Sequence, residues 1–229
     1  MIFNVLTIYK DFIEEYKSTG VIGRGVSSGA IQINVFDIRD YTTNKHGKVD
    51  DTPYGGGAGM VMTPQPVYDA VMAVKAGRDI PVIYFTPKGK TFNTSLSKHY
   101  ARECEEVILL CGHFEGIDQR AIDLCVSDEI SLGDYIITGG HIASICFIDS
   151  VARYISGVLG NDESTVEESF ENGLLECNQY TRPYEFMGKT VPDILLSGHH
   201  ENIRKYKDEQ SLELTKQRRE DLFLEQKNI

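Results

Sequence analysis

The sequence predicts an α/β protein with a parallel sheet in a larger first domain and a small helical domain after it. Three observations lead to this class. The middle of the chain repeats an apolar run, a glycine-bearing turn and a helical segment. The runs are apolar on both faces, which is typical of parallel strands covered by helices. An acidic stretch over residues 161–176 then separates this region from a tail of mixed charge.

Length and composition are those of an ordinary globular protein. The 229 residues are enough for one large or two small domains, and 41% of them are hydrophobic. No run approaches the roughly 20 apolar residues of a membrane-spanning helix, and the apolar start of the chain lacks the basic residues of a secretion signal. Five cysteines without a Cys-x-x-Cys pair indicate neither a disulfide framework nor a zinc site, and favour the reducing cytoplasm.

The net charge of −11 argues against nucleic acid as a partner, because phosphate contacts need Lys and Arg. The charge is spread unevenly, however. Residues 199–229 contain seven Lys or Arg and seven Asp or Glu, so residues 1–198 carry the whole net charge. A local basic face at the C-terminal end is therefore compatible with the total.

The first sixty residues predict a strand, a helix, a loop and a second strand, followed by a long polar segment. The predicted ranges are 2–8, 10–19, 20–29 and 31–38, where the loop over 20–29 leaves room for one helical turn, and the polar segment covers residues 39–53. It leads into residues 54–60, which hold four glycines in five positions. The spacing excludes a dinucleotide fingerprint and a Walker loop. The glycines leave two interpretations open, a mobile loop or a close approach to a ligand or second subunit.

The middle of the chain alternates helices and buried strands. We expect helices over 64–75, 94–102 and 119–124 and strands over 80–85, 107–111 and 126–132. Distinctive turns that begin at Thr86, Gly112 and Gly133 follow the three strands. Because the carboxyl ends of parallel strands meet at one edge, these turns predict a single ligand crevice. Residues 131–140 alone fit either a strand corner or a pocket wall.

The last third predicts a buried helix and a helical tail. The helix over 142–155 contains only two charged residues, Asp149 and Arg153, which form either an internal ion pair or an arginine directed at developing negative charge. An extended stretch over 180–192 precedes a helix that begins at Ser197 or Gly198, and a last helix covers 211–225. Adjacent histidines at 199 and 200 do not face each other on a helix, which disfavours a metal pair.

Six motifs occur in order along the chain. They are Asp50-Asp51-x-Pro-Tyr-Gly-Gly-Gly-x-Gly-Met60, Cys111-Gly112-x-x-Glu-Gly-Ile-Asp118, Gly133-Asp134-Tyr135-x-x-x-Gly-Gly140, Ser156-Gly-Val-Leu-Gly160, Tyr180-Thr-Arg-Pro183 and Val191-Pro-x-x-Leu-Leu-Ser-Gly-His199. With these motifs the chain closely resembles the bacterial tRNA (guanine-N1-)-methyltransferase family, TrmD, of the SPOUT type. Any one motif is weak, but six in order over nearly the whole chain are highly specific.

The resemblance implies a trefoil knot in an α/β domain over residues 1–160 that binds S-adenosylmethionine. It also implies an acidic linker over 161–176 and a helical domain over 177–229 that helps to hold the tRNA. The expected partners are a tRNA with guanosine at position 37 and a second copy of the chain in a homodimer, with no membrane or DNA partner. Magnesium is thought to assist the family's activity, but the sequence shows no ligand cluster for it.

The resemblance also implies the site residues. Those expected to bind the cofactor are Tyr84, Thr86, Pro87, Gly112, Glu115, Leu132, Gly133, Asp134, Tyr135, Ile136, Ile137, Gly139 and Gly140. The implied reaction is methyl transfer to N1 of guanosine 37, with Arg153 stabilising negative charge on O6. The general base falls on Glu168, where the family usually has aspartate, with Glu167 as the second candidate.

The chain departs from the family pattern in a few places. His113-Phe114 stands where Arg-Tyr or His-Tyr is commoner, His141-Ile142-Ala143 replaces a usual Glu-Leu-Pro, and Ser156 replaces a proline. Two other hypotheses stay open at this point. A non-catalytic RNA-binding relative of the same fold is favoured only by the glutamate at 168, and an α/β enzyme of nucleotide metabolism would bind no tRNA.

Overall fold

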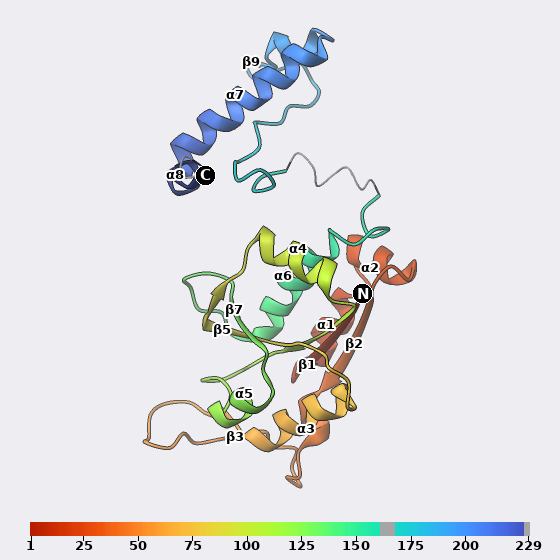
Figure 1. The fold of residues 1–229 in the computed structure, drawn as a ribbon, viewed down its shortest axis with the longest axis vertical. Helices are drawn as coiled ribbons and strands as arrows, with labels where there is room; N and C mark the ends of the chain where they lie inside the picture. The colour runs from red at the N-terminus through yellow and green to blue at the C-terminus, as the bar shows by residue number, and fades with distance from the viewer. Residues whose placement is uncertain (161–167, 227–229) are drawn as a thin grey trace. The chain divides into compact units, whose positions relative to one another are not determined.

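Two compact units make up the chain, residues 1–162 and residues 163–229. The computed structural model describes residues 1–160 and 168–226, and Figure 1 shows their helices and strands. The first unit contains the sheet and the second contains a hairpin and two helices. The predicted linker over 161–176 belongs largely to the second unit, and its residues 161–167 lie outside the described part.

The first unit is built on a five-stranded sheet with the strand order β2-β1-β6-β5-β7. All four neighbouring pairs run parallel, which confirms the predicted parallel sheet. The strands are β1 (Ile2–Thr7), β2 (Gln32–Asp37), β5 (Val82–Thr91), β6 (Glu106–Leu110) and β7 (Asp128–Ser131). A two-stranded ladder of β3 (Asp50–Asp51) and β4 (Val61–Met62) lies outside this sheet.

Helices cover both faces of the sheet and enclose two hydrophobic clusters. They are α1 (Lys10–Tyr16), α2 (Gly20–Ser27), α3 (Pro64–Lys75), α4 (Thr94–Glu103), α5 (Gln119–Cys125) and α6 (Gly140–Ala152), with a 3₁₀ turn η1 (Ile38–Tyr41) after β2. Successive residues of β6 enter opposite clusters. Leu109 packs with Phe147 of α6, and Leu110 packs with Val67 of α3. This double burial explains why the strands are apolar on both faces.

Helix α2 occupies residues where the sequence predicts a loop. Its glycines act as close-packing positions rather than as helix breakers. A Cβ atom at Gly23 would lie 2.4 Å from the carbonyl oxygen of Ser18, and one at Gly25 would lie 3.2 Å from a methyl group of Val158. The prediction was wrong here because local propensity penalises glycine, while tertiary packing requires it.

Strand β5 continues beyond the turn at which the sequence predicts its end. Phe85 and Lys90 both pair with Ile130 of β7, so the residues between them bulge out of the ladder. Pro87 lies within this bulge, where its missing N–H breaks no ladder bond. A Cβ atom at Gly89 would lie 2.4 Å from the backbone of Glu129, so glycine permits the strands to close again.

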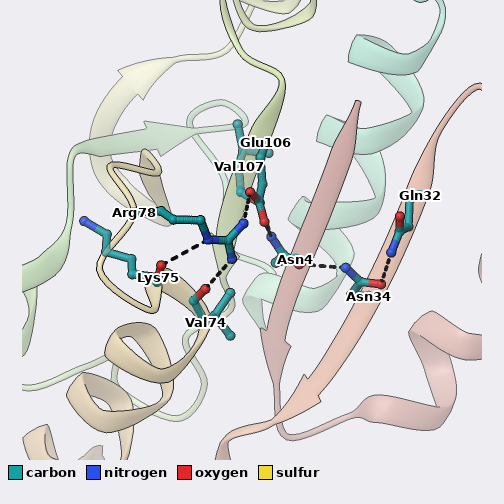
Figure 2. A network of polar contacts seen from close by, with 8 residues as sticks. All are labelled: Asn4, Gln32, Asn34, Val74, Lys75, Arg78, Glu106 and Val107. Atoms are coloured by element: carbon teal, nitrogen blue, oxygen red, sulfur yellow. Dashed lines mark hydrogen bonds and ion pairs between the residues drawn. The ribbon is translucent and has the colours of Figure 1, made fainter.

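A polar network crosses β2, β1 and β6 and reaches the end of α3 (Figure 2). Asn4 is 2% exposed and forms its centre. Its side chain accepts a hydrogen bond of 2.9 Å from Asn34 and donates one of 2.7 Å to Glu106. Glu106 in turn pairs with Arg78, whose guanidinium also donates to the carbonyl of Val74. The buried amide is thereby satisfied on both sides.

The second unit contains the hairpin strands β8 (Glu185–Phe186) and β9 (Lys189–Thr190), the 3₁₀ turn η3 (Asp193–Leu196), and the helices α7 (His200–Arg218) and α8 (Glu220–Gln226). The hairpin stands where a plain extended stretch was predicted. Helix α7 joins residues that the sequence divides between two helices, because its 19 residues contain no glycine or proline. Within the described residues, no helix is long and apolar enough to cross a membrane.

Candidate functional site

Three turns meet at one edge of the sheet and enclose a pocket of about 360 Å³. In chain order, the first interrupts β5, the second follows β6 and the third follows β7. These three strands are neighbours in the sheet. The first turn is the bulge over 86–89, the second covers 112–118 and the third covers 132–139. The sequence predicted that these three turns share one crevice, and the pocket lining brings them together.

The second turn packs tightly around Tyr84, which is 6% exposed. A Cβ atom at Gly112 would lie 2.8 Å from the Tyr84 ring, and one at Gly116 would lie 3.3 Å from its hydroxyl oxygen. Glycine at both positions therefore lets the main chain reach the ring. Burial raises the pKa of Tyr84, so its phenol stays protonated and able to donate a hydrogen bond at neutral pH.

The third turn carries the chain from β7, on one side of β5, to the end of β6 on the other side. The amide of Gly140 donates a hydrogen bond of 2.8 Å to the carbonyl oxygen of Gly112. A Cβ atom at Gly140 would lie 2.8 Å from the Cα atom of Cys111. The crossing is thus held by direct contact between main chains. It is the segment that the predicted knot would use, and the knot itself stays a prediction.

Twelve of the thirteen residues expected to bind the cofactor line this pocket. The thirteenth, Asp134, is exposed and does not line it. Their role as cofactor ligands stays a prediction. The pocket also includes residues that the sequence analysis did not assign to the cofactor: Phe85, Lys88, His113, Phe114, Gly116, Ile117, Gln119, Ile122, Glu129, Ile130, Ser131, Thr138 and Ala143. Six of these thirteen lie in the same three turns, and the other seven come from the adjoining strands and helices.

The composition of the lining fits an adenosine group with a charged tail. Apolar side chains such as Leu132 and Ile137 can cover the faces of a flat heterocycle. Main-chain amides and carbonyls at glycine positions can approach its edge closely. Glu115, Glu129 and Lys88 also line the pocket and place charges of both signs within reach of such a tail.

The glycine-rich loop over residues 54–60 is attached to the second turn of the pocket. Glu115 donates its backbone N–H to the carbonyl oxygen of Met60 at 2.9 Å. A Cβ atom at Gly59 would lie 2.5 Å from a carboxylate oxygen of Glu115. Earlier in the loop, Tyr54 is 98% exposed. One end of the loop is therefore anchored beside the pocket, while Tyr54 projects into solvent.

Arg153 lies at the end of α6 and lines a second pocket of about 260 Å³. This pocket is formed by α1, α2, α6 and the segment after it, with Tyr16 and Asp149 also in its lining. Asp149 is exposed and Arg153 is half-buried, so neither lies in the core, where one of the two alternatives from the sequence placed them. Arg153 does not line the first pocket.

Glu168 belongs to the second unit, where it is half-buried. Its carbonyl oxygen accepts a hydrogen bond of 3.2 Å from the amide of Glu171. The second candidate base, Glu167, lies outside the described residues. Both catalytic assignments stay predictions. Across the part of the chain that is described, no group of three or more His, Cys, Asp or Glu could hold a metal ion.

Comparisons with known proteins agree on one family. The family model described as tRNA (guanine-1)-methyltransferase TrmD matches residues 1–225. A tRNA (guanine-N(1)-)-methyltransferase of Clostridium perfringens (strain ATCC 13124) is 54% identical over 226 residues, covering 97% of this chain and 93% of the relative. The enzyme of the same name from Clostridioides difficile (strain 630) is 49% identical and covers 97% of both chains. That of Clostridium acetobutylicum is 51% identical over 220 residues, with 96% and 90% covered.

Proposed function

Because the chain belongs to the tRNA (guanine-N1-)-methyltransferase family TrmD, we propose that it methylates N1 of guanosine at position 37 of tRNA, with S-adenosylmethionine as methyl donor. The observation that carries the proposal is the pocket where three glycine-bearing turns meet, in a chain that matches the family from residue 1 to residue 225. The position next to the anticodon follows from the family resemblance.

The donor supplies a methyl group that is electrophilic because it is bonded to a positively charged sulfur. Residues of all three turns would hold it, with Thr86 from the first, Gly112 and Glu115 from the second, and Ile137 from the third, together with Tyr84 of β5. The main-chain contact between Gly140 and Gly112 fixes two of these turns relative to each other before any ligand binds. Such preorganisation reduces the ordering that binding requires.

The acceptor, N1 of guanine, carries a proton that must leave as the new N–C bond forms. The bond between the methyl carbon and the sulfur of the donor breaks in the same step, and its electron pair stays on sulfur, so the leaving group is the neutral thioether S-adenosylhomocysteine. We assign the removal of this proton to the Glu168 carboxylate, which acts as general base. Negative charge then develops toward O6 of the guanine, and we assign its stabilisation to the Arg153 guanidinium. The lengthening of the base from aspartate to glutamate moves its carboxylate by about one bond length, roughly 1.5 Å.

We further infer a homodimer and a tRNA-binding role for the helical tail. Helix α6 is almost uncharged, yet Cys146 on it is exposed, and Phe12 of α1 is 46% exposed. An apolar surface of this kind favours a second copy as partner. In the tail, α7 exposes several cations, namely Arg204, Lys205, Lys216 and Arg218, which suit phosphate contacts. We place the reaction in the cytoplasm, in keeping with five free cysteines.

The test is methyl transfer from labelled S-adenosylmethionine to a tRNA transcript with guanosine at position 37. A matched transcript with adenosine at that position serves as the control. We expect transfer to the first transcript only. Tight tRNA binding without transfer would instead support a non-catalytic relative, and absence of salt-dependent tRNA binding would support an enzyme of nucleotide metabolism. Repeating the assay with a chelator tests whether magnesium assists the reaction.

A further inference from the structure

Two histidine rings stack against each other beside the first pocket. His113 follows β6 in the second turn, lines the pocket and is 4% exposed. His141 is the second residue of α6, directly after the third turn. Their ring centroids are 5.1 Å apart, with 24° between the ring planes. The stack therefore joins two of the three turns by side-chain contact.

Two aromatic side chains, one just before α1 and one within it, pack against the stacked histidine rings. The ring of Tyr9 lies 4.8 Å from both imidazole rings, measured between centroids. The ring of Phe12 meets His141 edge-on at 5.0 Å. Three parts of the chain that are far apart in sequence thus meet at this pair, and the aromatic cover keeps water from its inner nitrogens.

Both imidazole rings also lie close to Gly139, the last residue of the third turn. A Cβ atom there would lie 2.4 Å from Nδ1 of His113 and 2.8 Å from Nδ1 of His141. Nδ1 of His141 and the second ring nitrogen of His113, Nε2, are buried without a hydrogen-bond partner. Such atoms are uncommon, and nothing at these two positions would compensate a positive charge on either ring.

The surroundings of the pair favour the uncharged rings. Burial, and to a smaller extent the proximity of His141, lowers the pKa of His113 to about 4. Burial also lowers the pKa of His141. Tyr9 and Phe12 are the aromatic side chains of the described residues whose rings pack against the pair, and no carboxylate of these residues contributes to either shift. The stack is therefore intact when both rings are neutral.

We propose that the stacked His113–His141 pair is the positioning element that holds the third turn of the pocket against the second, and that it does so only while both rings are neutral. The identity of the ligand as S-adenosylmethionine rests on the proposed function. Protonation of one ring places an unpaired charge beside the other ring, which separates the stack and releases Gly139. The pocket then loses the alignment of the third turn.

The direction of the pH effect follows from the two lowered pKa values. Each histidine has a lower pKa in the ordered pocket than it would have in an opened pocket, so protons bind preferentially to the opened state. The ordered state is therefore favoured at high pH. The preference for the ordered pocket is complete above the ordinary histidine pKa of about 6.5 and is lost as the pH falls toward 4. Cofactor affinity is thus expected to be constant from pH 7 to 8 and to fall below pH 6.5.

The test measures binding of S-adenosylhomocysteine by calorimetry between pH 5 and pH 8, which needs neither tRNA nor turnover. We expect the affinity of the wild-type protein to fall between pH 7.5 and pH 5 by up to roughly 30-fold, because pH 5 lies about 1.5 units below the ordinary histidine pKa and each unit of linkage is worth a factor of about ten. His141→Gln removes one ring and its charge. It should bind more weakly at pH 7.5 and show a shallower pH profile. His141→Glu places a carboxylate next to His113, raises the pKa of that ring and should shift the profile.

A purely structural role would lower affinity equally at every pH and leave the profile unchanged, and this result would overturn the proposal. So would wild-type affinity and profile in both His141 variants. His46→Gln, at an exposed position in a distant loop, is the matched control and should behave as wild type. Thermal unfolding of each variant establishes that it folds. If S-adenosylhomocysteine fails to bind at any pH, the proposed function fails, whereas binding without pH dependence contradicts only this inference.

Discussion

The phenol of Tyr16 donates a hydrogen bond of 3.1 Å to Oδ2 of Asp149, joining α1 to the last turn of α6. Asp149 accepts a second bond at its backbone carbonyl, from the amide of Arg153 at 3.4 Å. All three residues line the second pocket. Burial and the nearby Asp149 raise the pKa of Tyr16, so the phenol remains a donor throughout the physiological range. The position of Arg153 is therefore supported by a contact from another helix.

Replacing Arg153 by Ala should lower turnover by about 10²–10³-fold, because the charge that stabilises O6 is lost. Affinity for S-adenosylhomocysteine should change little, since Arg153 lines the second pocket and not the first. Single-turnover methylation and calorimetry measure the two effects. Tyr16→Phe, which removes only the hydrogen bond to Asp149, should give a much smaller loss. Unchanged turnover in Arg153→Ala would remove this residue from the chemistry.

The Glu168→Gln substitution keeps the size of the side chain but removes its ability to accept the N1 proton. Turnover should fall by roughly 10²–10⁴-fold, which is the usual contribution of a general base. The pH dependence of the rate should lose its acidic limb, while tRNA affinity is retained. Glu168→Asp, which restores the carboxylate one methylene shorter, should recover activity. If Glu168→Gln turns over like wild type, the base lies elsewhere, and Glu167→Gln is the next variant to measure.

Alanine at Gly140 should weaken cofactor binding by more than about tenfold. Its Cβ atom would lie 2.8 Å from the Cα atom of Cys111 and 2.9 Å from the amide nitrogen of Gly112. Both neighbours are main chain, so the second and third turns must separate to admit the methyl group. Calorimetry with S-adenosylhomocysteine gives the measurement. Gly160→Ala is the control, because nothing lies within 4 Å of a Cβ atom there. Equal affinity in the two variants would contradict the predicted role of this contact.

Substituting Asn4 by Ala should destabilise the protein by about 1–3 kcal/mol, because Asn34 and Glu106 lose a buried hydrogen-bond partner. The free energy of unfolding, measured by urea denaturation, checks this. Gln32→Ala removes the exposed end of the same network and should change stability by less than about 0.5 kcal/mol. A neutral Asn4→Ala would mean that the network contributes no net stability. Cofactor affinity should be unaffected in both variants.

Elements with strong local signals were predicted closely. Helix α3 has the predicted bounds, since Pro64 suits the first helical position and apolar residues recur at helical spacing. The side chain of Asn93 accepts a hydrogen bond from the amide of Leu96 and so caps the start of α4, close to the predicted start at residue 94. Helix α2 and the bulge in β5 were missed, because close contacts with distant residues decide both. The C-terminal helices were divided wrongly, although the residues within them were helical.

The parallel sheet and the three turns at its edge were predictable from the amino-acid sequence. Apolar runs and glycine positions are properties of short segments, so they can be recognised before the fold is known. Three other features emerged from the folded chain alone: Asp134 does not line the first pocket, Arg153 lines a second one, and His113 stacks on His141. Each of these depends on how a strand or helix is rotated against partners far away in the sequence. Such rotations are set by packing of the whole core, which no local pattern contains.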